Sequence, residues 1–318
     1  MNDLDPILDN VRLALASGAD PAMLLTVALA SMSPESIEEA FDQLYAKKAA
    51  ICELVNAGPG DQARRPAVLE PDLSLEPELG RMRPDLGDHE IRGRLLFRDL
   101  LGRTSFFQLA AFAIGGVSVT GDQAAYIEHC GVVTQLLDPK IWGLAVARRV
   151  GARSTDLAHA LIAGLACLCT PRMTGQPVGA FMRFLDDTER RMKSGTTLDE
   201  WLDDILARGE RIPGIGRPVA GPDERVPEIK KLAGRYDLAS GRSWRLALAI
   251  DVYFRARGKP GINSAGLHGA LMRDFGFSPS AASALSMIYF VLPVLANAVY
   301  LENGPPSAEN VSAIQNDV

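Results

Sequence analysis

The stretch TLDEWLDDILARG, residues 197–209, shows the periodicity that decides the fold class. Its apolar residues recur at the three- and four-residue spacing that places side chains on one face of an α-helix. They are Leu198, Trp201, Leu202, Ile205 and Leu206. The aspartates between them fall opposite this stripe. The stretch therefore predicts an amphipathic helix that packs through one face.

Helical spacing also dominates the rest of the chain, and we find no convincing alternation of the kind that marks a β-strand. We expect helices over residues 91–116, 122–137, 140–151, 154–169, 175–195, 224–237, 240–258, 263–276 and 281–301. The segment 154–169 is apolar nearly all round, so it should be central. Helix starts at Asp5-Pro6 and Ser33-Pro34 precede a Pro/Gly-rich stretch up to residue 88, which indicates a linker or an irregular wrap. The predicted fold class is all-α.

Composition excludes one function class. The 318 residues carry a net charge of -6, and only 6% of them are aromatic. A general nucleic-acid binder needs cations for phosphates and rings for stacking, so the sequence argues against one. The first ten residues are acidic and lack the pattern of a signal peptide, which favours a cytoplasmic protein. The four cysteines (Cys52, Cys130, Cys167 and Cys169) lack zinc-site spacing and are expected to be reduced and buried.

The segment Ala281–Leu301 is long and apolar enough to span a membrane. It contains Ser283, Ser286 and Asn297, and it has no basic flank. These features favour a fully buried helix, placed at a subunit interface, over a membrane span. We therefore expect no membrane partner.

Two aspartate pairs suggest an alternative function. Asp186-Asp187 and Asp203-Asp204 lie in expected helices, and all-α isoprenoid synthases hold magnesium with aspartate-rich helices. Neither pair completes a DDxxD box, so both are interpreted as solvated helix faces. The histidines (His89, His129, His159 and His268) include no pair at i, i+4, so no helical metal site is expected.

The stretch PGIGRPVAGPDER, residues 213–225, is a glycine-rich turn between two expected helices. Its glycine spacing does not match the dinucleotide fingerprint, and no strand precedes it. It also lacks the G-x4-GK[ST] pattern of a P-loop. A turn of this kind often holds a ligand, and Arg217 is the cation within it.

Four segments resemble, in the same order, segments of the citrate synthase superfamily, which includes citryl-CoA lyases. Residues 91–116 are similar to the family's IRGYDLAELMGRLSFAE, and residues 154–187 to the helix before its GPLHGGANEAVLRML turn. Residues 213–225 resemble PGFGHPVYKGGDPR, and GKPGINSAGLHGAL at 258–271 resembles PNVDFYSGLVL. The resemblance covers roughly residues 91–302.

The resemblance implies a helical homodimer whose protomer has a large and a small, mobile domain. The large domain would comprise residues 89–175 and 262–318, and the small acyl-CoA-binding domain residues 176–261, after N-terminal helices and a linker at 1–88. The family reaction is a Claisen-type condensation or its reverse, in which a carboxylate removes a proton, two histidines polarise carbonyl groups and arginines bind carboxylates.

The family's catalytic set is replaced in this chain. Its aspartate falls on Asn263, which takes up no proton at neutral pH, and the histidine of the glycine-rich turn falls on Arg217, a permanent cation. The histidine of the PLHGG turn falls on Met173. The last histidine should fall near residues 135–142, where Asp138 is the titratable acid, and Arg225 matches a family arginine. A further arginine, expected near 292–293, is lost.

Losing one positioned acid or base typically costs roughly 10²–10⁴ in rate, which argues against standard citrate synthesis. We expect instead altered chemistry on an acyl-CoA thioester and a keto or carboxylic acid, or a non-catalytic homologue that serves as a ligand sensor or as a partner of an intact family member. The expected catalytic residues are Arg217, Asn263, His268 and Asp138. The expected substrate-binding residues are Arg225, Arg217 and Met173, and those contacting coenzyme A are Pro213, Gly214, Ile215 and Gly216. No metal is expected.

Overall fold

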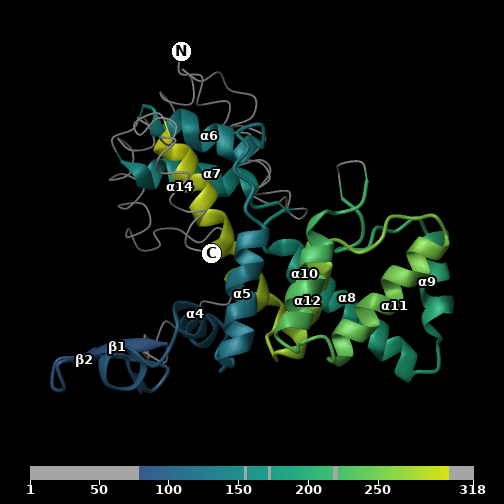
Figure 1. The fold of residues 1–318 in the computed structure, drawn as a ribbon, viewed down its shortest axis with the longest axis horizontal. Coiled ribbons are helices and arrows are strands. Elements are labelled where there is room, and N and C mark those ends of the chain that lie inside the picture. Colours follow the sequence, from purple (N-terminus) through teal and green to yellow (C-terminus); the bar gives the residue numbers. More distant parts are fainter. Residues whose placement is uncertain (1–78, 154–155, 171–172, 218–220, 301–318) are drawn as a thin grey trace, which may run out of the picture. The chain divides into compact units, whose positions relative to one another are not determined.

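The computed structural model describes residues 79–153, 156–170, 173–217 and 221–300, and these are mostly helical (Figure 1). The N-terminal helices expected at Asp5 and Ser33 lie outside the described residues. The helices are α4 (Phe106–Gly115), α5 (Gly121–Val133), α6 (Trp142–Gly151), α7 (Leu157–Leu168), α8 (Gln176–Lys193), α9 (Leu198–Ala207), α10 (Arg225–Arg235), α11 (Arg242–Ala256), α12 (Ser264–Asp274), α13 (Pro279–Met287) and α14 (Val291–Ala298). The predicted all-α class is confirmed.

A small antiparallel sheet precedes these helices, so the expectation of no strands is wrong there. Its strands are β1 (Gly80–Arg83), β2 (Asp88–Ile91) and β3 (Arg94–Leu95), in the order β1-β2-β3, followed by a π-helical turn at Leu96–Leu100. The strands escaped prediction because they bury almost no apolar side chain, and Met82 is 70% exposed. Asp88 is buried instead and accepts the backbone N–H groups of His89, Phe97 and Arg98 at 2.7, 2.9 and 3.2 Å.

The helix expected over residues 91–116 therefore occupies only the end of that stretch. It begins at Phe106 because Ser105 and Gln108 form a reciprocal capping box, which satisfies free N–H groups of the first turn. The helix expected from residue 140 begins at Trp142, and Asp138 instead accepts the N–H of Lys140 at 2.9 Å.

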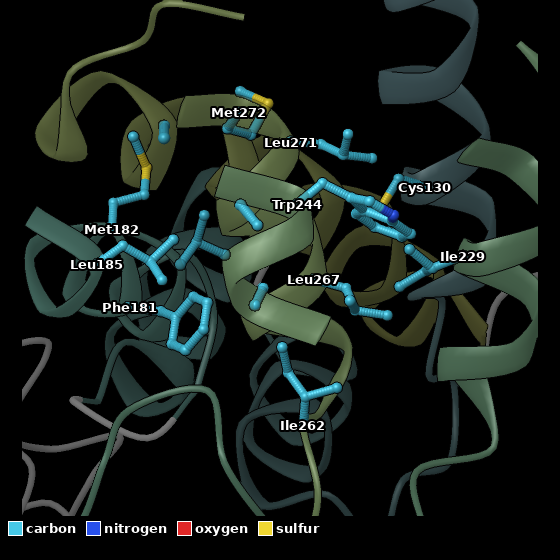
Figure 2. Packing of buried hydrophobic residues seen from close by; sticks show 14 of the residues in the cluster. Cys130, Phe181, Met182, Leu185, Ile229, Trp244, Ile262, Leu267, Leu271 and Met272 are labelled. Carbon is cyan, nitrogen blue, oxygen red and sulfur yellow. The ribbon is translucent and has the colours of Figure 1, made fainter. Parts of the chain in front are cut away.

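The larger hydrophobic core joins α4, α5 and α8–α13. Figure 2 shows part of it, with side chains from α5, α8, α10, α11 and α12. Helix α12 is its centre, with eight buried residues among eleven. Gly269 allows α12 to approach α8, because a Cβ there would lie 2.8 Å from the carbonyl oxygen of Val178. In α9 the predicted stripe is confirmed: Trp201, Leu202 and Ile205 are buried in this core.

A smaller core joins α6, α7 and α14 through Leu144, Ala147, Leu168 and Val294. Helix α7 lies here and leaves Ile162 63% exposed, so the expectation that residues 154–169 are central is wrong. The centre of the larger core is instead α12, whose glycines and alanines let neighbouring helices pack closely against it. The predicted domain boundaries at residues 176 and 261 stay a prediction.

The long apolar segment near the C-terminus is two helices joined by a 3₁₀ turn at Ile288–Phe290. Pro293 has no N–H to donate to the carbonyl of Tyr289, and the side-chain amide of Gln135 donates to that carbonyl at 3.0 Å. The span Pro279–Ala298 is long and apolar enough to cross a membrane, but half of it is buried within the chain. The segment is thus two helices that are about half buried, in place of the expected single, fully buried helix.

Two of the cysteines behave as expected. Cys130 and Cys167 are free and buried, and burial raises the pKa of the Cys130 thiol to about 12. Cys169 is free and only partly buried. Cys52 lies outside the described residues.

Candidate functional site

The glycine loop, residues Pro213–Arg217, leads toward α10 and has a fixed backbone shape. Gly214 has a φ of +80°, and a Cβ at this position would lie 2.6 Å from the ring of Phe181. Gly216 also has a positive φ, of +67°. L-residues with a side chain rarely adopt this conformation, and Gly214 has no room for a Cβ, so the first glycine is required on both grounds.

The glycine loop is held on the segment that starts α12. Ile215 and Ile262 form an antiparallel bridge, and the N–H of Gly216 donates to the carbonyl of Gly261 at 2.9 Å. The N–H of Asn263 donates to the carbonyl of Gly214 at 2.9 Å. Much of the backbone expected to contact coenzyme A is therefore paired within the chain.

Asn263 links the loop to α12 through both ends of its side chain. Its amide nitrogen donates to the carbonyl of Gly216 at 2.6 Å, and its amide oxygen accepts the N–H of Gly266 at 3.1 Å as the N-cap of α12. An Asn at an N-cap satisfies one of the free N–H groups of the first turn. In this structure the amide predicted to meet a thioester oxygen is used to position the loop.

Asp223 is the buried carboxylate around which the site is built. Its side chain is 2% exposed and accepts two parallel bonds from Arg225, from Nε at 2.8 Å and from a terminal nitrogen at 2.9 Å. It also accepts the N–H of Ser264, the first residue of α12, at 2.8 Å. Burial alone would raise the pKa of this carboxyl, but the hydrogen bonds and the charge of Arg225 outweigh it and lower the pKa to about 2.

Arg217 lies beside the same carboxylate but is bound less completely. One terminal nitrogen contacts Glu224 and lies 3.9 Å from Asp223. The side chain of Arg217 is 19% exposed, whereas that of Glu224 is 64% exposed. The Nε of Arg217 is buried and has no hydrogen-bond partner among the described residues. Buried donors are nearly always paired, so this atom is an unusual feature of the site.

These five residues, Arg217, Asp223, Glu224, Arg225 and Asn263, form what we call the loop cluster. It offers two fixed cations and one buried carboxylate that stays ionised far below neutral pH. A carboxylate with so low a pKa is a poor proton acceptor at neutral pH. The arrangement is therefore suited to binding an anion or stabilising an oxyanion, and not to removing a proton from carbon.

His268 lies inside the larger core, on the same helix as Asn263. It is 3% exposed, its Nδ1 lies 3.3 Å from the hydroxyl of Tyr126, and its Nε2 is buried without a partner among the described residues. Burial lowers the pKa of this imidazole to about 4, so the side chain is neutral at pH 7. Its neighbours are Tyr126 and Tyr289 and not the loop cluster, which disfavours the predicted role in proton transfer.

The structure does not bring the other expected residues to the loop cluster. Met173 is partly buried and packs against the smaller core. Asp138 is exposed and caps the turn before α6. Of the expected side chains, Arg217, Arg225 and Asn263 thus converge, while Met173, Asp138 and His268 have other surroundings.

Sequence reasoning missed Asp223 and Glu224. Both stand in the quoted stretch between the two expected arginines, and a carboxylate two residues before an arginine was the available signal. Their pairing with Arg217 could not be read from spacing, because it depends on how the glycine loop folds against α12.

A cavity of about 440 Å³ lies elsewhere, beside Arg273. Arg273 contacts Asp186 at 2.8 Å, Glu189 at 3.0 Å and the hydroxyl of Ser243 at 2.8 Å. A smaller cavity of about 170 Å³ lies beside His129. Neither cavity is lined by a residue of the loop cluster.

The same contacts decide the isoprenoid alternative. Asp186 pairs with Arg273, whereas Asp203 contacts Tyr253 and lies 3.5 Å from Arg257. Neither of the two described cavities is lined by both aspartates, whereas a magnesium–diphosphate site would need them to face a common space. Within the described residues, no three His, Cys, Asp or Glu side chains are grouped so that they could hold a metal ion. The separate partners of Asp186 and Asp203 therefore disfavour the isoprenoid alternative.

Comparison with known proteins identifies the relatives of this architecture. The family model for the citrate synthase C-terminal domain matches residues 145–303, half of the chain. No curated protein sequence matches the chain.

Solved structures with the same fold include the citryl-CoA lyase of Hydrogenobacter thermophilus. It superposes with a TM-score of 0.59 at 21% identity, over 67% of this chain and 82% of the lyase. The ATP citrate lyase of Methanosaeta concilii, solved as a D541A mutant with (3S)-citryl-CoA, has a TM-score of 0.57 at 16% identity, over 87% of this chain and 50% of its own. The ATP citrate lyase of Methanothrix soehngenii, solved with citrate and coenzyme A, has a TM-score of 0.57 at 17% identity, over 87% of this chain and 48% of its own. At these identities the likeness establishes the fold.

Proposed function

Because this chain belongs to the citrate synthase superfamily, we propose that it binds a coenzyme A thioester together with a keto or carboxylic acid. We further propose that it forms or cleaves a carbon–carbon bond next to the thioester by altered chemistry. The observation that carries the proposal is the convergence of Arg217, Arg225 and Asn263 around Asp223, on the loop that the resemblance assigns to the ligands.

The loop cluster would act on the charge that develops during such a reaction. In the cleavage direction the bond between a hydroxyl-bearing carbon and the α-carbon of the thioester breaks. The hydroxyl proton leaves, its oxygen becomes a carbonyl, and the bonding electron pair forms a thioester enolate that then takes up a proton. Arg217 would stabilise an oxyanion as a fixed cation. Since Arg217 exchanges no proton and Asp223 has a pKa of about 2, we assign both proton transfers to groups outside the loop cluster.

A second candidate, a non-catalytic homologue that senses a ligand or accompanies an intact family member, is favoured by one observation. The amide nitrogen and the amide oxygen of Asn263 both bind backbone groups that position the loop, as expected of a side chain retained for structure. A cytoplasmic location, a homodimer and a heteromer with an intact relative are also proposals. Light scattering of the purified chain tests the homodimer, and light scattering of the chain mixed with an intact relative tests the heteromer.

The first experiment is a thermal-shift screen of the full chain with coenzyme A, acetyl-CoA, malonyl-CoA and several keto and dicarboxylic acids. A ligand at 100 times its dissociation constant adds about 2.7 kcal/mol to the free energy of unfolding, so a true ligand raises the melting temperature clearly. If no thioester shifts the melting temperature, the coenzyme A part of both candidates is wrong.

Mass spectrometry of the reaction products then separates the candidates. With a thioester and a keto acid that bind, the enzyme candidate predicts formation of the coupled hydroxyacyl thioester, or its cleavage in the reverse direction, and this conversion is lost in Arg217→Met. Binding without conversion in any combination would favour the sensor or partner-subunit candidate.

A further inference from the structure

We propose that Asp251 is a positioning residue for the loop cluster. Its buried carboxylate holds the short segment of residues 261–264 in the place where Asn263 and the glycine loop meet. The inference deepens the proposed function and rests on it for the reaction that the positioning would serve. Asp251 acts through the backbone of the segment, which in turn carries the glycine loop with Arg217.

Residues 261–264 form a short extended segment that is bound along both of its edges. Ile262 lies in the antiparallel bridge to the glycine loop, and Asn263 has extended dihedral angles, φ −104° and ψ 178°. Successive N–H groups point to opposite edges of an extended chain. The N–H of Asn263 therefore faces the glycine loop, while those of Ile262 and Ser264 face the other edge.

Buried carboxylates bind the two N–H groups on that other edge. Asp223 accepts the N–H of Ser264, and Asp251, in α11, accepts that of Ile262, each at 2.8 Å. Asp251 is 4% exposed. Gly261 lets the segment pass close to α11, because a Cβ at that position would collide with the carboxylate of Asp251. Asp223 belongs to the loop cluster, whereas Asp251 supports the segment from outside it.

The same carboxylate also joins α10 and α11. It accepts the Nε of Arg255, one turn later in α11, at 2.8 Å, and the Nζ of Lys230 in α10 lies 3.5 Å from it. These cations are 48% and 40% exposed, so both are rehydrated if the carboxylate is removed. The N–H of Ile262 has no such escape, because this residue is 1% exposed and packs in the larger core. The cost of removing Asp251 should therefore fall on the segment.

A buried N–H without an acceptor is costly, and a segment relieves this cost by moving until the group reaches water. Movement of residues 261–264 would break the bridge to the glycine loop. It would also displace Asn263, whose side chain binds the carbonyl of Gly216 next to Arg217. The carboxylate of Asp251 thus controls the position of the loop cluster without touching a ligand.

Amide hydrogen exchange of the full chain, followed by NMR, tests the positioning directly. The N–H groups of Gly216 and Asn263 form the two bonds of the bridge, so their exchange reports whether residues 261–264 stay in place. In Asp251→Ala these amides should exchange at least about tenfold faster, because the closed segment loses a hydrogen bond to a charged group. Asp251→Asn keeps an oxygen for the N–H of Ile262, so its rates should lie between those of the alanine variant and the unaltered chain.

The matched control is Asp274→Ala. Asp274 is also a carboxylate that accepts backbone N–H groups, those of Ser243 and Trp244 at the start of α11, at 2.8 and 2.9 Å. Neither of these partners belongs to residues 261–264 or to the glycine loop. The amides of the bridge should therefore keep their exchange rates in this variant.

Mass spectrometry of the reaction products connects the positioning to the proposed reaction. A misplacement of about 1 Å can cost roughly 10²-fold in rate, so conversion should slow by up to this factor in Asp251→Ala. It should slow less in Asp251→Asn and stay unchanged in Asp274→Ala. A purely structural role would lower stability without changing the rate of the folded molecules.

Three results would overturn the inference. They are unchanged exchange at the bridge in Asp251→Ala, an equal rise in Asp251→Ala and Asp274→Ala, and an unchanged conversion rate in Asp251→Ala. If the unaltered chain converts no substrate while the bridge exchanges faster in Asp251→Ala alone, the proposed function is wrong and Asp251 still positions the loop cluster. The exchange measurement needs no thioester and no turnover, so the two failures give different patterns.

Discussion

Arg273 and Arg217 are both arginines held by carboxylates, but their surroundings differ. Arg273 lies beside a cavity of about 440 Å³, and each of its side-chain nitrogens is bound, to Asp186, Glu189 or Ser243. Arg217 lines neither described cavity and keeps a buried Nε without a partner among the described residues.

The difference shows that a nearby cavity and a free N–H donor for a ligand are separate properties. A fully bound arginine next to a large hollow joins elements, here α8, α11 and α12, and has no donor left for a ligand. Arg217, with an unused donor and an exposed partner, is the better candidate to bind an anion, although it lines neither of the two described cavities. We therefore expect Arg273 to contribute mainly to stability and Arg217 mainly to ligand binding.

The largest effect on stability is expected for Arg273→Met. The change leaves Glu189, which is 8% exposed, without its main cation, and removing one partner of a buried pair costs about 3 kcal/mol. Urea unfolding followed by circular dichroism measures this loss. Arg242→Met is the control, because Arg242 contacts the same carboxylate at 2.9 Å but is 66% exposed. Equal stability of the two variants would contradict a structural role for Arg273.

A smaller effect that depends on pH is expected for Asp223→Asn. The pKa of Asp223 is lowered from 3.8 to about 2, so its contribution is present above pH 4 and is lost as the pH falls through 2. This shift corresponds to a loss of about 2 kcal/mol at pH 7. The unfolding free energies of Asp223→Asn and the unaltered chain should differ at pH 7 and converge as the pH approaches 2. A difference that is constant with pH would show that the charge of Asp223 is not the cause.

The smallest effect on stability is expected for Arg217→Met. Methionine keeps much of the apolar stem, Asp223 keeps Arg225, and the exposed Glu224 returns to solvent, so the unfolding free energy should change by less than about 1 kcal/mol. The same variant should lose citrate binding in calorimetry. A loss of stability as large as that of Arg273→Met would remove the distinction between the two arginines.

Sequence alone predicted what depends on repeated local spacing. The apolar stripe of α9 was found because every turn of the helix repeats it, and Trp201, Leu202 and Ile205 are indeed buried. The sheet at residues 80–95 was missed because its strands bury Asp88 instead of alternating apolar side chains. Helix α7 was placed at the centre because a run of apolar residues cannot show which of its faces meets solvent.

The candidate site was predictable only in part, for a similar reason. Arg217, Arg225 and Asn263 were found by the order of motifs along the chain. Asp223 and Glu224 were missed, since their importance arises from contacts with Arg217 and with the start of α12. His268 was expected to be reactive because it follows a helix start, but the side of α12 that carries it faces Tyr126 and Tyr289.

The buried carboxylate of Asp88 has a consequence for the dynamics of the sheet that precedes α4. This sheet has no buried apolar side chain of its own, and the single carboxylate accepts the amide N–H groups of Phe97 and Arg98. Segments with few buried contacts open locally, at a free energy well below that of global unfolding. The amide protons of Phe97 and Arg98 thus exchange with solvent when this sheet opens by itself, while those in the middle of α12 exchange only when the larger core unfolds.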